Sequence, residues 1–174
     1  VRLLFGCELN IVDYSGTIDL SERMLKRLSY TVVSLHDLCL KPGTMEDNTF
    51  AVLTALKNPY VTILGHPDDG RYMVDMEAVV QAAKEYHTLL ELNNNSLNPR
   101  CTRQNAREND MEMLRLCKKY QVPIVMGSDA HYYEDILNHE LALDLIKETE
   151  FPEELVVNTD REKLYPFINK YQKV

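Results

Sequence analysis

The sequence predicts an α/β fold built on a parallel sheet, and three observations lead to this prediction. Short runs rich in Val, Ile and Leu alternate with longer segments whose apolar residues recur at helical spacing. Such alternation is typical of parallel strands joined by crossover helices. The runs at 61–65 and 123–127 are short and mostly apolar, as strands buried inside a parallel sheet are. Finally, no internal repeat or clear linker divides the 174 residues, so we expect a single domain over residues 1–174.

The expected strands are fewer than a complete barrel requires. A full (β/α) barrel typically takes roughly 250 residues. The sequence therefore predicts either a (β/α) barrel with a piece missing or an open α/β sheet. Strands are expected at 2–8, 31–35, 61–65, 88–92, 123–127 and 155–158.

Helical patterns fill the segments between these strands. The segment 75–86 is amphipathic, with Met76, Val79 and Ala83 on one stripe, and Asp47 is a candidate N-cap at the start of another segment. Helices are expected at 20–28, 47–56, 75–86, 109–120, 140–148 and 161–170.

The net charge limits the kinds of molecule that the protein is expected to bind. The formal net charge of −8 argues against a protein that binds the phosphate backbone of nucleic acid, which usually carries a basic face. It leaves room for a small phosphorylated substrate, because bound metal ions can supply positive charge locally.

Targeting signals and cysteine usage point to the cytoplasm. No run of eighteen apolar residues predicts a membrane span, and no signal-peptide pattern is visible. The four cysteines include no CxxC pair, so we expect reduced thiols. The chain begins with Val1 on a strand-like run, which suggests a piece of a longer protein.

Polar side chains follow five successive predicted strands at their carboxyl ends, where α/β folds bind ligands. A single histidine at such a place is more often a hydrogen-bonded structural residue. Here three of the five histidines lie at strand exits and carboxylates lie at two of them, which favours a Zn, Mn or Fe site. The candidate metal ligands are Glu8, His36, His66, Asp129 and His131.

Other polar residues near these exits allow two interpretations. Asp37, Asp68 and Asp69 either orient the imidazoles or are solvated loop carboxylates. In the amide-rich loop after the fourth strand, Asn93 is expected to be structural. Phosphate binding is predicted for other residues of this loop, although surface arginines are common. The phosphate-binding candidates are Asn94, Ser96, Arg100 and Arg103.

Local backbone features support the same site. Pro67 is expected to bias His66 towards an extended conformation. Gly65 and Gly127 allow close approach of neighbouring groups. The remaining histidines, His87 and His139, are expected to be structural. No P-loop, GxSxG elbow or Cys–His arrangement is present, so a covalent mechanism has no support.

A set of motifs resembles one known family. GCELN, VVSLHD, ILGHPD, LELNNNS and MGSDAH are similar to successive motifs of the PHP (polymerase and histidinol phosphatase) family. Their order and spacing most resemble those of the bacterial YcdX-type phosphatases, and the likeness continues through FPEELVVNTDREKL. The resemblance spans essentially the whole chain.

This resemblance implies a distorted seven-stranded (β/α) barrel that hydrolyses phosphoesters with up to three divalent metal ions, foremost Zn. Glu8 would bridge two of the metals, and His36 and His66 would complete one of those sites. Asp129 would bind the metal on the other side of Glu8, and His131 the remaining one. Asp129 and His131 are also the catalytic candidates.

The sequence departs from the family pattern because the amino-terminal motifs, an HxH with a further His and then a DH, are absent. We therefore expect the C-terminal portion of a PHP domain, with its first strands missing and one metal fully liganded. An unpaired sheet edge invites association, so a homo-oligomer is expected; a monomer in sedimentation would contradict this. The alternatives are a catalytically inactive metal-binding fragment and a nuclease-type PHP domain, which the acidic charge disfavours.

Overall fold

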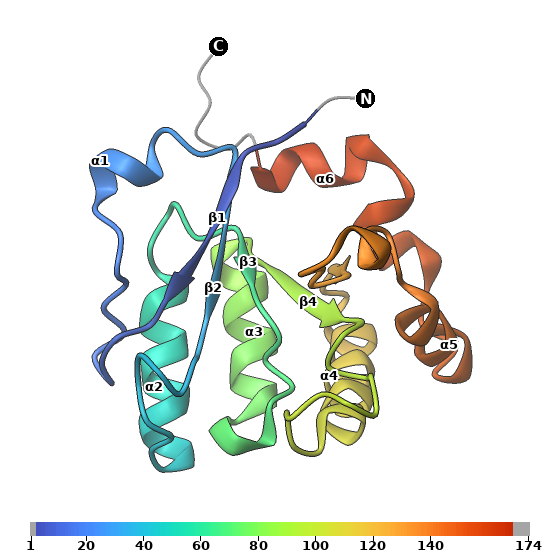
Figure 1. Ribbon diagram of the computed structural model, residues 1–174, viewed down its shortest axis with the longest axis horizontal. Coiled ribbons are helices and arrows are strands. Elements are labelled where there is room, and N and C mark those ends of the chain that lie inside the picture. The colour runs from blue at the N-terminus through green and yellow to red at the C-terminus, as the bar shows by residue number, and fades with distance from the viewer. Residues whose placement is uncertain (1–2, 169–174) are drawn as a thin grey trace.

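The computed structural model describes residues 3–168 and contains one five-stranded parallel sheet. The strands lie side by side in the order in which they occur along the chain (Figure 1). The predicted α/β class is therefore confirmed. The strands are β1 (Gly6–Asn10), β2 (Tyr30–Ser34), β3 (Ile63–Leu64), β4 (Leu89–Asn93) and β5 (Ile124–Gly127).

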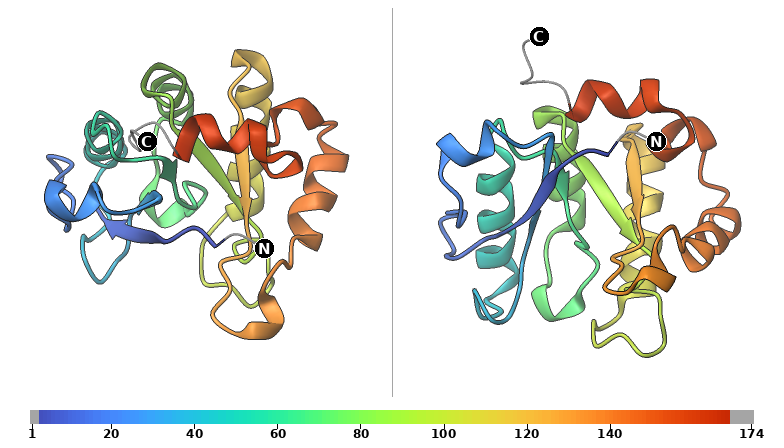
Figure 2. Two further views of the ribbon diagram at one scale, coloured as in Figure 1. Left: turned by 90° about the horizontal axis from the view of Figure 1, so that it is seen from above. Right: turned by 45° about the horizontal axis from the view of Figure 1, so that its top comes forward.

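Three long helices cover one face of this sheet, and the main core lies between them and the strands. Figure 2 shows α2, α3 and α4 in a row along the same side of the strands. Leu9, Val33 and Leu92 point from the sheet into this core and are fully buried. None of the helices within residues 3–168 is both long and apolar enough to cross a membrane. The helices are α1 (Glu22–Leu25), α2 (Met45–Leu56), α3 (Met76–Tyr86), α4 (Ala106–Tyr120), α5 (Glu140–Glu148) and α6 (Arg161–Ile168).

The opposite face of the sheet is divided between apolar and polar residues. At the amino ends of the strands, Ile63 and Leu89 pack against Val157 and against Phe167 of α6. Towards the carboxyl ends the same face carries polar side chains, because alternate residues of a strand share a face. These polar residues are Glu8, Asn10, Ser34, Glu91 and Asn93. The candidate site therefore lies at the carboxyl end of this face.

The predicted strand at 155–158 is wrong. The segment forms two short 3₁₀ turns, Glu153–Leu155 and Val157–Thr159, and only Val156 makes a β-bridge, to Ile124. The reason is visible at Asn158, whose side-chain amide both accepts from the Met126 N–H (2.6 Å) and donates to the Met126 carbonyl (3.0 Å). The Asn158 side chain thus binds the backbone N–H and C=O groups of Met126, with which a sixth strand would have paired.

Element boundaries differ from the prediction at several ends. β1 begins at Gly6, not at residue 2, and Arg2 lies outside the described residues, as do the last two residues of the helix expected at 161–170. The N-cap of α2 is Thr44 and not Asp47, which lies at the third helical position and completes a reciprocal capping box with Thr44. Asp75, the first residue of the helix expected at 75–86, is the N-cap of α3.

Candidate metal centre

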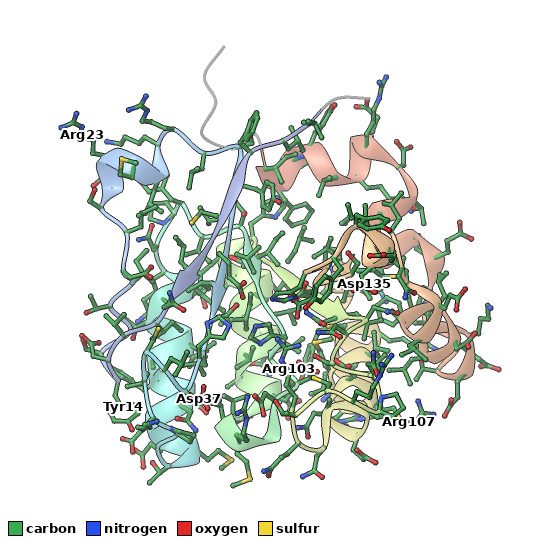
Figure 3. The ribbon with its side chains drawn as sticks, in the orientation of Figure 1. Tyr14, Arg23, Asp37, Arg103, Arg107 and Asp135 are labelled. Atoms are coloured by element: carbon green, nitrogen blue, oxygen red, sulfur yellow. The ribbon has the colours of Figure 1, made fainter. Side chains whose placement is uncertain are left out.

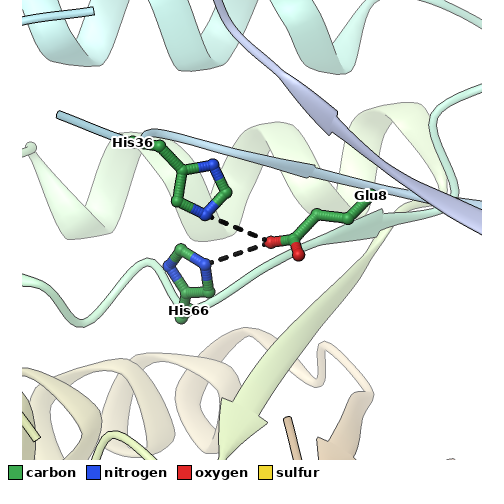
Figure 4. A group of neighbouring side chains, drawn as sticks. All are labelled: Glu8, His36 and His66. Carbon is green, nitrogen blue, oxygen red and sulfur yellow. Dashed lines mark hydrogen bonds and ion pairs between the residues drawn. The ribbon is translucent and has the colours of Figure 1, made fainter. Parts of the chain in front are cut away.

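Three predicted ligands converge at the carboxyl end of the sheet. Glu8 lies on β1, while His36 and His66 each follow their strand by two residues (Figure 4). Their ligating atoms all lie within 4.8 Å of one another. The Nε2 atoms of His36 and His66 lie 3.4 and 3.2 Å from the same oxygen, Oε1 of Glu8. Two imidazole nitrogens and one carboxylate facing each other form a donor set that suits a divalent transition metal.

The sheet register explains why Glu8 faces the histidines. Glu8 pairs with Val32 in the parallel register, so its side chain lies on the face that also carries Ser34. The Ser34 hydroxyl donates to Oε1 of Glu8 at 2.7 Å, which fixes the carboxylate. Hydrogen bonds from His36 and His66, followed by smaller effects, hold the pKa of Glu8 far below its ordinary value. The carboxylate is thus ionised and available as a ligand.

A polar chain orients the His36 ring. The Asp19 carboxylate, which only accepts, takes the Asn10 side-chain N–H at 2.6 Å and so turns the Asn10 oxygen towards His36. That oxygen lies 2.7 Å from Nδ1 of His36, which must therefore carry the proton. The remaining nitrogen, Nε2, faces Glu8 and is the atom that a metal ion would bind. This is the arrangement by which proteins orient a metal-binding imidazole.

Replacing Asn10 by alanine is expected to lower the affinity for Zn²⁺ or Mn²⁺ by about 10- to 100-fold, because His36 would lose the group that fixes its tautomer and ring orientation. Titration calorimetry measures the change. Asn138→Ala is the control, because Asn138 is exposed and its oxygen only accepts the Glu140 N–H. An unchanged affinity in Asn10→Ala would show that Asn10 does not orient the ligand.

His66 is held in an unusual backbone conformation. Its φ is +28°, so the extended conformation expected from Pro67 is wrong. The cause is Glu91, whose Oε2 accepts the His66 N–H at 2.8 Å. The Glu91 carboxylate fits here because Gly127 has no Cβ, which would collide with Oε1 of Glu91. A Cβ at Gly65 would instead collide with Ser34 and Val32. The expected close approach at these two glycines is thus confirmed. Backbone strain of this kind often occurs at functional sites.

Burial also affects the His66 side chain, of which only 5% is exposed. Desolvation acts to lower its pKa, but the hydrogen bond with Glu8 and the charges of Glu91 and Asp68 outweigh this effect and raise it overall. In the metal-free protein the imidazole therefore keeps its proton up to a higher pH than an ordinary histidine does. A metal ion bound at Nε2 would replace that proton.

Comparison with known proteins places the chain in a family. A probable phosphatase of Caldicellulosiruptor saccharolyticus is 47% identical over 173 residues, which cover 99% of this chain and 71% of that protein. A probable phosphatase of Clostridium novyi is 41% identical over 174 residues, or 100% of this chain and 70% of that protein. The chain belongs to this family of probable phosphatases.

Two further comparisons concern the fold and the family models. No family model matches the sequence. A solved structure described as the cryo-EM structure of archaeal Ribonuclease P with mature tRNA contains a similar chain, with a TM-score of 0.64 and 18% identity. The likeness covers 98% of this chain and 70% of the other. At this low identity it shows a shared fold alone.

The other two predicted ligands lie apart from the three-residue group. Asp129 follows β5 by two residues, with a φ of +50°, and its Oδ2 accepts from Arg103 at 3.1 Å. The His131 side chain is 73% exposed, and its Nδ1 lies 2.9 Å from the Asp129 carbonyl. Among the described residues, only Glu8, His36 and His66 form a group with the spacing of a metal site.

The predicted phosphate-binding residues have diverse surroundings. Asn94 is buried and its oxygen accepts the Ala142 N–H at the start of α5 (3.0 Å). The buried Ser96 hydroxyl accepts from Arg103 at 2.8 Å. Arg100 is exposed on the loop surface. Asn93 accepts the Ser96 N–H at 3.0 Å, which is the structural role expected of it. Phosphate binding by the four candidates stays a prediction.

The two interpretations of the nearby aspartates can now be compared. Asp69 and Asp37 both pair with Arg71 and do not contact an imidazole through any described hydrogen bond. Asp68 is fully buried, and neither of its carboxylate oxygens has a hydrogen-bond partner among the described residues. Figure 3 shows Asp37 at the same end of the sheet as Arg103 and Arg107. The imidazoles are instead oriented by Asn10 and Glu8.

The two remaining histidines lie away from the site. His87 ends α3 and stacks on Phe167 of α6, with ring centroids 4.2 Å apart, beside the small core at the amino ends of the strands. His139 precedes α5, where burial lowers its pKa. His87 thus lies at the opposite end of the sheet, as expected, while His139 lies outside the three-residue group and its Nδ1 is buried without a hydrogen-bond partner among the described residues.

Sequence reasoning missed Asn10, Ser34 and Glu91 as parts of the site. The sequence did contain a signal for Asn10 and Ser34, because residues two positions apart on a strand share a face. Asn10 lies two residues after Glu8, and Ser34 two residues before His36. Glu91 required knowledge of the neighbouring strands, since its contacts are with His66 and Gly127.

Proposed function

We propose that this chain carries part of the active site of a metal-dependent phosphoester hydrolase of the PHP family. The observation that carries the proposal is the convergence of Glu8, His36 and His66 in a chain whose relatives are named probable phosphatases. The sequence motifs at these three positions resemble those of the PHP family. A small phosphorylated molecule is the proposed substrate.

The residues of the group fit a divalent cation. Ser34 holds the Glu8 carboxylate, Asn10 turns a lone pair of His36 towards it, and His66 is fixed by Glu91. With three protein donors, tetrahedral or five-coordinate Zn keeps positions open for water or a phosphate oxygen, and Mn or Fe are alternatives. When bound, such an ion lowers the pKa of a water to roughly 7 and offsets charge on the phosphoryl group.

Further roles are proposed for residues around this group. Asp129 and His131 would hold additional ions, up to three in an intact family member, and assist proton transfer. Of the predicted phosphate contacts, Asn94, Ser96 and Arg100 are proposed to bind the substrate phosphate. The ligand set of one ion is complete within this chain, whereas Asp129 and His131 need partners from elsewhere.

The strand order supports a barrel-like fold over residues 1–174 as a single domain. In a doubly wound sheet the strand order reverses at a switch point and helices cover both faces. Here the order runs from β1 to β5 without reversal, and α2, α3 and α4 share one face. The other face carries the polar site, as the interior mouth of a (β/α) barrel does. We infer that the sheet is part of a distorted (β/α) barrel.

An assay of p-nitrophenyl phosphate hydrolysis tests the proposed function. The protein is stripped with a chelator and then supplied with Zn²⁺ or Mn²⁺. We expect hydrolysis to disappear on chelation and to return with metal, and anomalous scattering to show an ion between Glu8, His36 and His66. Hydrolysis that persists without metal, or an ion bound elsewhere, would overturn the proposal.

An inactive metal-binding fragment is the second candidate, favoured by one observation. Asp129 and His131 do not join the three-ligand group within the described residues. The same assay separates the candidates, because this fragment would bind one ion and leave the aryl phosphate intact. The acidic net charge of −8 disfavours a nuclease-type PHP domain.

A further inference from the structure

The Arg103 guanidinium lies in a largely buried polar network beside the candidate metal centre, and only 13% of the side chain is exposed. We propose that Arg103 is a positioning residue that fixes the Asp129 carboxylate, and that it does so in place of a direct contact with the substrate phosphate. This inference rests on the proposed function, in which Asp129 is a metal ligand.

The contacts of Arg103 tie three segments together. Its Nη2 donates to Oδ2 of Asp129 after β5 (3.1 Å), and its Nη1 donates to the Ser96 hydroxyl in the loop after β4 (2.8 Å). A longer contact from Nη1 reaches the Asn93 oxygen at the end of β4 (3.4 Å). A guanidinium with its donors used in this way would have to break these bonds to reach a phosphate group.

The charges around Arg103 also favour a fixed position. Asp68 and Asp110 are fully buried, and burial raises the pKa of both carboxyl groups, while the positive charge of Arg103 opposes this effect. The half-buried Glu91 side chain adds to the negative potential at Asp110. Arginine stays protonated in proteins, so Arg103 gives this cluster a permanent counter-charge. Its removal would leave several carboxyl groups without compensation.

Arg103 holds only one of the two carboxylate oxygens of Asp129. Arg103 binds Oδ2, while Oδ1 lies on the side of His131, 3.8 Å from its Nδ1. The backbone of Asp129 is in the left-handed region, so its side chain has no regular element to orient it. Carboxylates that bind metals are commonly held by a hydrogen bond to one oxygen, and the loss of that bond costs about 10- to 100-fold in metal affinity or activity.

The test compares Arg103→Lys with Arg107→Lys in the whole chain. Arg107 is a matched control, because it follows on the next helix but forms an ion pair with Glu148 on the surface, where both side chains are 49% exposed. The measurements are Mn²⁺ affinity, kcat and KM for p-nitrophenyl phosphate, and inhibition by inorganic phosphate. For Arg103→Lys we expect an about 10- to 100-fold loss in kcat, while KM, phosphate inhibition and the Mn²⁺ affinity of the three-residue group stay unchanged.

A weakening of phosphate inhibition and a rise in KM, with kcat unchanged, would overturn the proposal and make Arg103 a phosphate ligand. Ser96→Ala provides a milder variant should Arg103→Lys fail to fold, since it removes one anchor of the guanidinium. It is expected to show a smaller loss in kcat.

A double-mutant cycle keeps this inference separate from the proposed function. Arg103→Lys and Asp129→Asn are combined, and unfolding in denaturant is measured without metal. We expect the double variant to be less destabilised than the sum of the single variants. Additive effects would overturn the positioning role even in a protein with no activity. A chain that binds no metal would instead overturn the proposed function.

Discussion

Glu8→Gln is expected to remove most metal binding and, with it, phosphatase activity. The carboxylate oxygen Oε1 of Glu8 lies within 3.4 Å of both imidazole nitrogens and is the only negative charge in the three-residue group. Changes in groups that merely orient a ligand cost 10- to 100-fold in affinity, so the loss of the ligand itself is expected to cost at least about 100-fold. Calorimetric titration with Zn²⁺ or Mn²⁺ and the aryl phosphate assay measure the effect.

The glutamine variant should keep the fold, because its amide oxygen can still accept the Ser34 hydroxyl that now donates to Glu8. Glu22→Gln is the control, since Glu22 is 65% exposed and pairs only with exposed groups. Exposed ion pairs contribute little to stability. Retention of metal affinity in Glu8→Gln, with a normal unfolding transition, would show that Glu8 is not a ligand.

The fold class and the three-residue group could be predicted because both depend on local patterns. Val- and Ile-rich runs separated by amphipathic helices leave a parallel sheet as the simplest arrangement, and the carboxyl ends of parallel strands meet at one edge. His36 and His66 each follow a strand by two residues, which brings them to that edge beside Glu8.

The rest of the site depends on contacts between distant residues, which a local pattern does not reveal. The backbone of His66 is set by Glu91, 25 residues away, and this contact overrides the preference that Pro67 imposes. The expected strand at 155–158 failed for a similar reason. Its residues favour a strand, but the Asn158 side chain occupies the edge of β5 instead.

Asp110→Asn is expected to stabilise the metal-free protein at alkaline pH. Asp110 lies on α4, is fully buried, and has no hydrogen-bond partner for either carboxylate oxygen among the described residues. Desolvation, followed by the charges of Asp68 and Glu91, raises its pKa well above the ordinary value of 3.8. The folded state therefore binds more protons than the unfolded state, and stability falls as the pH rises from about 3.8 through the folded-state pKa.

Asparagine has nearly the same shape as aspartate and cannot ionise, so the stability of the variant does not fall in this way as the pH rises. We expect its free energy of unfolding to match that of the wild type below pH 3.8, where both side chains are neutral. At pH 8 it should exceed that of the wild type by more than about 1 kcal/mol, because each unit of a pKa shift is worth about 1.36 kcal/mol. Urea titrations at both pH values, with chelator present, measure the difference. Asp144→Asn is the control, because Asp144 is 74% exposed and should give no pH-dependent difference. A wild type that is the more stable protein at pH 8 would mean that the Asp110 carboxylate is ionised and paired with a cation, because only a counter-charge offsets the cost of burying it.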